Sequence, residues 1–212
     1  PDDLEIITIE GGARELNVIR LDDQGLPANN VMHLLTRESN DESLNITQEI
    51  LVEKMLRLNP DICSVAEMRN TEALAAQESS TSGHVVISTT HAGSPRQAHK
   101  RIADLCRKKY PIDYRDALEN ARDAFPLVVF LHMGEDHKRR IMAVTECCPD
   151  QADNYAYRTL WEYRTERTVQ DGRTLRIIGK HVQVNNPSDS LMAHMRLYNI
   201  TEKEISDLSM TT

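Results

Sequence analysis

The sequence predicts an α/β fold in which a parallel sheet is followed by an antiparallel hairpin unit and small helices. Up to about residue 125, short β-branched runs alternate with segments of helical periodicity, the order that builds a parallel sheet covered by helices. Beyond that point, two pairs of apolar runs flank turn sequences, as in β-hairpins. We therefore expect two parts, residues 1–125 and residues 126–212.

Four β-rich runs are the candidate strands of the first part. They are Leu4–Ile9, Asn17–Leu21, Ile62–Ala66 and His84–Thr90. The stretch from Gly25 to Ser43 is polar and irregular, and we expect it to be a mobile loop. Ligands of open parallel sheets bind beyond the carboxyl ends of the strands, so a site is expected just after these runs.

Segments with an apolar stripe at helical spacing lie between and after the runs. They span about residues 47–58, 71–83, 95–109 and 113–125. Pro60 ends the first, and Asn70 or Thr71 caps the second. Ser94-Pro95 begins the third with a capping hydroxyl and a proline at the first helical position. Helices placed in this way favour a sheet that is covered on both faces.

The second part has a period of two instead. Its candidate strands form two hairpins, 127–133 with 140–146 and 155–169 with 174–184. Two short helices follow, one capped by Ser188 and one that starts with the capping box Thr201 to Glu204.

Composition excludes several classes of protein. The 212 residues carry a net charge of −8, which argues against non-specific binding of nucleic acid. No apolar run approaches the roughly 20 residues that span a bilayer. The four cysteines lack C-x-x-C spacing, so we expect reduced thiols in a cytoplasmic protein, with the adjacent Cys147 and Cys148 as an alternative redox pair.

One stretch of this acidic chain contains more basic than acidic residues. Between Tyr155 and His181 there are six basic residues and three acidic ones. The basic residues are Arg158, Arg164, Arg167, Arg173, Arg176 and Lys180. This stretch is either a strand pair with solvated polar faces or a surface that docks a partner.

Polar residues follow three of the candidate strands. Glu10 ends the first run, Glu67 follows Ile62–Ala66, and His91 follows the run that starts at His84. In a parallel sheet such residues converge on one crevice. Two carboxylates and an imidazole suit phosphoryl transfer to water, in which one acid holds a magnesium-bound water and another orients the attacking water.

Two motifs give the sequence a resemblance to a known family. Residues 57–69 read R-L-N-P-D-I-C-S-V-A-E-M-R and resemble the Walker B motif R-x-x-P-D-x-I-x-x-G-E-x-R of the type II/type IV secretion ATPases. Residues 83–92 read G-H-V-V-I-S-T-T-H-A and resemble their His box. Thr8-Ile9-Glu10 is similar to the start of their Asp box, and the surrounding residues resemble the CpaF-type pilus-assembly branch.

This resemblance implies a RecA-like domain that hydrolyses ATP with Mg²⁺ in a hexameric ring, docked on an inner-membrane platform protein. By position, Glu67 is the Walker B acid that acts through magnesium, and Glu10 is a candidate general base. His91 and His84 are candidate phosphate contacts, and Arg69 supports the Walker B loop or contacts the nucleotide.

Three departures qualify that expectation. Gly11-Gly12 stands where the Asp box has a second carboxylate, which Glu15 replaces only with a shifted loop. Ala66 and Cys63 replace two Walker B residues. No G-x-x-x-x-G-K-[ST] occurs in the sequence, so the amide cradle and the phosphate-binding lysine of a P-loop are missing. We therefore expect the C-terminal part of a longer motor, inactive by itself, or alternatively a non-catalytic assembly module of a secretion machine.

Overall fold

The computed structural model describes residues 3–149, 155–172 and 174–208. The chain divides into two compact units. Unit 1 comprises residues 1–93 and 97–125, and unit 2 comprises residues 94–96 and 126–212. Within the described ranges, no helix has the length and apolar character needed to cross a membrane.

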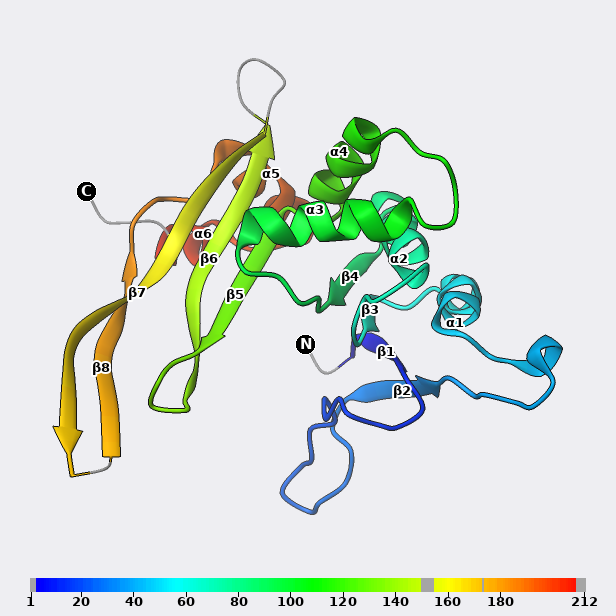
Figure 1. Ribbon diagram of the computed structural model, residues 1–212, viewed down its shortest axis with the longest axis horizontal. Coiled ribbons are helices and arrows are strands. Elements are labelled where there is room, and N and C mark those ends of the chain that lie inside the picture. Colours follow the sequence, from blue (N-terminus) through cyan, green and yellow to red (C-terminus); the bar gives the residue numbers. More distant parts are fainter. Residues whose placement is uncertain (1–2, 150–154, 173, 209–212) are drawn as a thin grey trace. The chain divides into compact units, whose positions relative to one another are not determined.

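Unit 1 contains a four-stranded parallel sheet (Figure 1), which confirms the predicted fold class. Its strands are β1 (Glu5–Glu10), β2 (Asn30–Leu35), β3 (Ile62–Val65) and β4 (Val85–Ser88), in the order β2-β1-β3-β4. The register aligns their carboxyl ends, because Ile9 pairs with Val65 and Val65 pairs with Ser88. Side chains that follow these strands therefore start from one edge of the sheet.

One predicted strand is wrong. Asn17–Leu21 forms no strand, and its last residue makes only an isolated bridge to Pro27. The chain there is held by the Asn29 side chain, which accepts a hydrogen bond from Arg20 N and donates one to Val18 O. β1 pairs with β3 on one side and with β2 on the other, and β2 lies inside the stretch we expected to be a loop. The sequence of β2, N-V-M-H-L-L, is rich in apolar residues, as a strand requires. We did not predict this strand because the residues on both sides of it are polar.

The helices of unit 1 follow the predicted segments. They are α1 (Gln48–Met55), α2 (Glu72–Thr81), α3 (Pro95–Cys106) and α4 (Tyr114–Ala124), with a 3₁₀ turn η1 (Glu42–Leu44) before α1 and another, η2 (Leu56–Leu58), after it. Thr47 caps α1 and Asp113 caps α4 through their side chains. An apolar core lies between sheet and helices, with Ile7, Ile9 and Val65 fully buried among residues of α1, α2, α3 and α4. This core fixes the strands whose ends carry the candidate site.

Unit 2 is built on a four-stranded antiparallel sheet whose strands follow one another in chain order. They are β5 (Leu127–Met133), β6 (Arg139–Pro149), β7 (Tyr155–Asp171) and β8 (Thr174–Gln183). β6 pairs with β7 only as far as Glu162, so the rest of β7 and its partner β8 extend as a two-stranded ribbon (Figure 1). Arg173, in the predicted turn of this hairpin, lies outside the described residues.

Polar contacts join distant segments of unit 2. Asp136, in the β5–β6 turn, pairs with Arg140 at 2.5 Å, and both groups also bond the main chain of Ile177 in β8. At the other end of the sheet, the buried Glu146 accepts a hydrogen bond from Ser188 N at 3.0 Å. Ser188 caps α5 (Asp189–Leu197), as predicted, and is thereby fixed to β6. The last helix, α6 (Glu202–Asp207), begins with the predicted capping box.

Candidate active site

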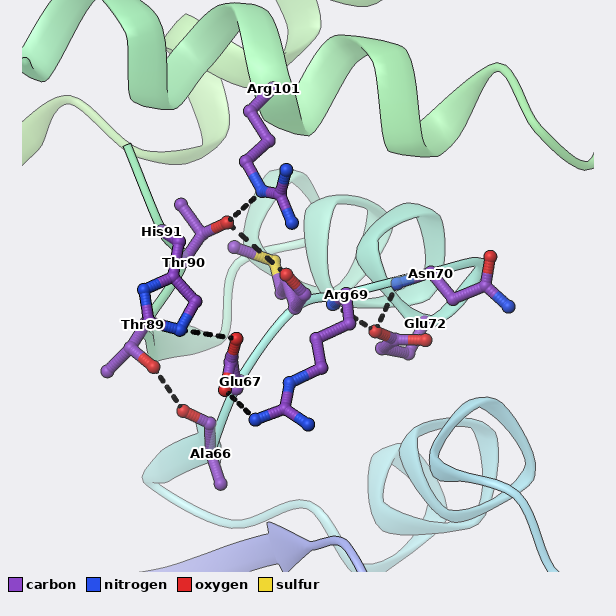
Figure 2. Close-up of polar contacts among 10 residues, drawn as sticks. Ala66, Glu67, Arg69, Asn70, Glu72, Thr89, Thr90, His91 and Arg101 are labelled. Atoms are coloured by element: carbon purple, nitrogen blue, oxygen red, sulfur yellow. Dashed lines mark hydrogen bonds and ion pairs between the residues drawn. The ribbon is translucent and has the colours of Figure 1, made fainter. Parts of the chain in front are cut away.

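Glu67 is the centre of a cluster of charged side chains at the carboxyl edge of the parallel sheet (Figure 2). It lies two residues beyond the end of β3, and its side chain is 20% exposed. Arg69 Nη2 donates to Glu67 Oε2 at 2.5 Å, and His91 Nε2 lies 3.3 Å from Glu67 Oε1. The cluster therefore joins the loop after β3 to the loop after β4, as the sequence predicted for Glu67 and His91.

The surroundings of Glu67 favour its ionised form. The hydrogen bond from Arg69 has the largest effect and lowers the pKa of Glu67, while partial burial opposes it. The charges of Arg69, His91 and Arg101 lower the pKa of Glu67 further, so that it lies below its ordinary value. An ionised carboxylate at this position accepts hydrogen bonds from a metal-bound water, and it is a weak base toward an unactivated water.

Hydrogen bonds hold the two loops side by side. Met68 N donates to Thr89 O at 2.8 Å, and Thr89 Oγ1 donates to Ala66 O at 2.6 Å. Thr90 Oγ1 contacts Met68 O at 3.2 Å and accepts a hydrogen bond from Arg101 Nε at 3.1 Å. Figure 2 shows Arg101 reaching from α3 toward these loops. The sequence motifs contained Thr89 and Thr90 but gave no sign that a helix beyond them contributes an arginine.

The start of α2 fixes the conformation of Arg69. The buried Glu72 accepts a hydrogen bond from Asn70 N at 2.6 Å and another from Arg69 N. Thr71 stands at the N-cap position, yet its side chain makes no capping bond and instead donates to Glu49 at 3.2 Å. Thr71 thus takes the predicted N-cap position, but the predicted side-chain cap is wrong, because Ala73 N and Leu74 N donate to the main-chain carbonyls of Asn70 and Thr71.

Glu10 lies at the same edge but is completely buried. Its Oε1 accepts a hydrogen bond from Thr8 Oγ1 at 2.9 Å and lies 3.1 Å from His33 Nδ1. Its Oε2 accepts hydrogen bonds from the main-chain amides of Glu15 and of Leu16, the latter at 2.6 Å. All four acceptor positions of the carboxylate are thus occupied. In this conformation Glu10 anchors the loop that follows β1, and it offers no free lone pair to an attacking water.

The pKa of Glu10 reflects this balance. Burial is the largest influence and raises the pKa of Glu10, but the four hydrogen bonds together outweigh it. The pKa of Glu10 therefore lies below its ordinary value, and the buried group stays charged. His33, in β2, completes the anchor, since its Nδ1 also lies 2.7 Å from Thr8 Oγ1. The sequence analysis missed His33 because β2 itself was missed.

The anchored loop presents a second carboxylate. Glu15 is exposed, and its charge contributes to raising the pKa of Arg69, for which the hydrogen bond to Glu67 is the largest cause. Glu15 therefore acts electrostatically on the arginine that binds Glu67. It follows Glu10 by five residues, and its assignment as the second acid of an Asp box stays a prediction.

His84 is not brought to the cluster. It immediately precedes β4, whereas His91 follows the other end of that strand. The two histidines of the motif therefore lie at opposite ends of β4, and only His91 contacts Glu67. The side chain of His84 contributes a buried Nδ1 that makes no hydrogen bond.

The described part of the chain contains no group of three or more His, Cys, Asp or Glu side chains that could hold a metal ion. A divalent cation at this edge would need most of its ligands from water and from the phosphates of a substrate. Glu67 Oε1 suits such a shell, because it is a buried oxygen that makes no hydrogen bond of good geometry although His91 is near. The residues present therefore fit a Mg²⁺ ion held through water, and they exclude a cage made of protein ligands alone.

Comparison with protein families gives a match to the type II/IV secretion system protein family over residues 2–125, which is essentially unit 1. Among solved structures, the chain is similar to the VirB11 ATPase of the Brucella suis type IV secretion system, determined in complex with sulphate. The TM-score is 0.56 and the identity 27%, over 69% of this chain and 41% of VirB11.

Curated relatives match parts of the chain as well. An uncharacterized protein of Methanocaldococcus jannaschii is 36% identical over 145 residues, 66% of this chain and 25% of that protein. The competence protein ComGA of Streptococcus pneumoniae is 36% identical over 66 residues, 31% of this chain and 21% of that protein. The chain thus spans about a quarter of the length of the curated relatives it matches. Because the family match covers more than half of its residues and includes the whole candidate site, this chain belongs to the type II/IV secretion system protein family.

Proposed function

We propose that this chain is the motor part of an ATPase that powers protein secretion or type IV pilus assembly. The observation that carries this proposal is the Glu67 cluster, in which an ionised carboxylate at the carboxyl edge of a parallel sheet is surrounded by Arg69, His91 and Arg101. Ligands of such sheets bind at this edge. Membership of the secretion family supports ATP as the ligand.

Glu67 has the central role in the proposed reaction. Bound ATP with Mg²⁺ supplies the phosphoryl group and the charge neutralisation that phosphoryl transfer needs. Glu67 Oε1, the oxygen without a hydrogen bond, would hold a water bound to such an ion. Arg69 holds the other oxygen, and thereby orients the carboxylate and keeps it ionised.

The general base is a second carboxylate near Glu67. In the conformation described, Glu10 is enclosed, and its role is to hold the loop that carries Glu15. We infer that Glu15, which is exposed and whose charge acts on Arg69, orients the attacking water. His91, 84% exposed, is available to contact a phosphate oxygen. The geometry gives no support for a phosphate contact by His84.

A second function is favoured by one sequence observation. The 212 residues contain no phosphate-binding loop of the P-loop type, so this chain alone lacks the amides that cradle phosphates. By itself it would then act as a non-catalytic assembly module of the same machine. An ATPase assay on the purified chain separates the two functions. We expect no turnover, and a rate within the ordinary enzymatic range of about 1–10³ per second would refute the dependence on a P-loop.

Glu67→Gln tests the site in a longer chain that includes a phosphate-binding loop. The amide has nearly the same size but bears no charge, so we expect hydrolysis to fall by roughly 10²-fold or more, while nucleotide binding persists. Turnover and binding of a fluorescent ATP analogue are measured together. Glu53→Gln, at an exposed position of α1, is the matched control and leaves turnover unchanged. Normal turnover by Glu67→Gln would remove Glu67 from the site.

We further propose that the longer protein assembles into a hexameric ring in the cytoplasm and docks on an inner-membrane platform protein. Ring motors place the nucleotide between subunits, so a heterologous contact needs both complementary faces. Light scattering of the longer protein with and without ATP checks the ring, and a strict monomer with ATP bound would contradict it.

A further inference from the structure

The β7–β8 ribbon presents its basic residues on one face. In the ladder, Arg164 stands opposite Lys180, Arg167 opposite Ile178, and Val169 opposite Arg176. Residues that are directly opposite share a face of the sheet. Four basic side chains therefore lie on one side of the ribbon, which we name the basic face: Arg164, Arg167, Arg176 and Lys180. The sequence showed the excess of charge but not its segregation.

The opposite face of the ribbon is engaged within unit 2. Tyr163 lies edge-on to His181 with ring centroids 5.3 Å apart, and the Arg140 guanidinium lies 5.6 Å from the Tyr163 ring. Gly179 is closely approached by Tyr163, since a Cβ at that glycine would lie 2.8 Å from the ring. The hairpin is thus fixed through one face, which leaves the basic face available to a partner.

Among the acidic side chains that the structure describes in the ribbon, two pair with basic residues of this face. Glu162 pairs with Arg164 at 2.6 Å, and Glu166 pairs with Lys180 at 2.9 Å. Arg167 and Arg176 are exposed, and they form no ion pair with any side chain that the structure describes. Between them lie Val169, which is 37% exposed, and the half-buried Ile178. The patch is a two-by-two arrangement, with arginines on one diagonal and apolar side chains on the other.

The spacing of the two arginines selects a kind of partner. Diagonal neighbours of an antiparallel pair are about 7–8 Å apart. Alternate residues of an extended chain are about 7 Å apart and point to the same side. Two carboxylates at positions i and i+2 of an extended segment therefore match the two guanidinium groups, each of which can bind a carboxylate in bidentate fashion. We propose that the basic face binds an extended acidic segment of a partner protein, in which acidic residues alternate with others.

Two other polyanions fit less well. A duplex needs several phosphates neutralised at once, and an anionic membrane needs a cluster of about 4–8 basic residues. Here two of the four basic groups already have acidic partners, and the molecule as a whole has a charge of −8. A short acidic segment with two aligned carboxylates does not require more than Arg167 and Arg176 offer.

The test uses the full 212-residue chain and a fluorescein-labelled peptide in which Glu and Thr alternate. We expect saturable binding in fluorescence anisotropy that weakens as salt is added. Reversing both charges, with Arg167→Glu and Arg176→Glu, should lower the affinity at least about tenfold, because attraction becomes repulsion at two contacts. The neutral pair Arg167→Gln and Arg176→Gln should give an intermediate loss, and it guards against misfolding of the reversed variant.

Controls decide between this proposal and its competitors. Lys100→Glu reverses one charge, half the change made by the double reversal, at an exposed position of α3, and we expect it to leave the affinity unchanged; each single reversal, Arg167→Glu or Arg176→Glu, is compared with it. A peptide of equal composition with its glutamates in one block should bind more weakly than the alternating peptide. The proposal is overturned by absence of saturable binding, by equal binding of both peptides, or by insensitivity to the two reversals. Tighter binding of duplex DNA or of anionic phospholipid vesicles, with the same dependence on Arg167 and Arg176, overturns it as well. So does self-association that the reversals abolish.

Discussion

Unit 1 and unit 2 are held together by different interactions. Every residue of the apolar core cluster belongs to unit 1, where Ile7, Ile9 and Val65 are fully shielded from water. Among the described residues of unit 2, the buried apolar side chains are few: Cys147, Leu160, Pro187, Leu191 and Ile205. It relies instead on polar contacts between segments about 40 residues apart, such as Asp136 with Ile177 and Glu146 with Ser188. Burial of apolar area dominates the stability of the first unit, and hydrogen-bonded charges shape the second.

This difference gives the two units different points of failure. An apolar core fails by degrees as methylenes are removed, since each removal costs the lost transfer free energy and a cavity term that depends on how far the site collapses. A buried charge fails abruptly, because removing one partner leaves the other desolvated and unpaired. The only tryptophan, Trp161, lies in β7, so its fluorescence reports on unit 2, while most helices, and hence most helical circular dichroism, belong to unit 1.

The largest effect is expected from Ile9→Ala in the core of unit 1. The variant removes a fully buried side chain beside the site, and we expect a loss of about 2–5 kcal/mol in the free energy of unfolding. Urea unfolding followed by circular dichroism should show it, with a smaller change in Trp161 fluorescence. Met32→Ala, at a position 42% exposed, is the control and should change the free energy by less than about 0.5 kcal/mol. If both probes shift equally, the two units unfold as one and the contrast between them fails.

Asp136→Asn tests the polar contacts of unit 2. The Arg140 guanidinium, through its hydrogen bond, holds the pKa of Asp136 far below its usual range, against the opposing effect of burial. Stability from this carboxylate is therefore present above the unfolded carboxyl pKa of about 3.9 and is lost as the pH falls below it. We expect Asp136→Asn to move the Trp161 transition to lower urea at neutral pH and to reduce its dependence on acid. Glu135→Gln, at the exposed neighbouring position, should leave the transition where it is.

A smaller effect is expected from His99, which makes unit 1 sensitive to a different range of pH. Its ring is buried in unit 1, and Nε2 lies 2.8 Å from Phe125 O. Burial is the main cause that lowers the pKa of His99, and the charge of Arg122 adds to it, against the hydrogen bond to Phe125. In the unfolded chain the His99 imidazole has its ordinary pKa of about 6.5, and in the folded chain its pKa is lower. Below about pH 6.5 the unfolded chain therefore binds the proton more readily, and the free energy of unfolding of unit 1 should fall.

His99→Gln should remove this slope, because an amide preserves a donor for Phe125 O and does not titrate in that range. The pH dependence of stability is measured from urea midpoints, followed by circular dichroism between pH 5 and pH 8. His132→Gln, exposed in β5, is the control. A slope that survives His99→Gln would assign the acid sensitivity to another group.

The contrast between the units also explains what the sequence could predict. Period and capping residues identified seven of the eight strands, and all six α-helices, because those signals are local. β2 was missed because its apolar residues stand among polar loops. Strand ends located Glu67 and His91 correctly, since the register of a parallel sheet brings such ends together. The enclosure of Glu10 by His33 and main-chain amides depends on which strand pairs with β1, and that information is not local.

Similar reasoning applies to residues that the motifs placed or omitted. The His box counts His84 and His91 together, but a strand of four residues separates them and sends them to opposite ends of the sheet. Arg101 reaches the site from a helix that begins beyond the motif, and only the packed fold shows that its Nε meets Thr90. A sequence motif identifies residues at the ends of strands. It misses residues whose side chains reach the site from a helix that packs on the sheet.

The anchor at Glu10 has a practical consequence for protein engineering. Its carboxylate contacts the loop that follows only through main-chain amides, those of Glu15 and Leu16. Every residue except proline has a main-chain N–H, so these hydrogen bonds do not depend on which side chains the loop carries. Ala13 and Arg14 are exposed within the span so fixed. A library randomised at those two positions would thus vary the side chains of the loop at the carboxyl edge of the sheet while the attachment of the loop stays the same.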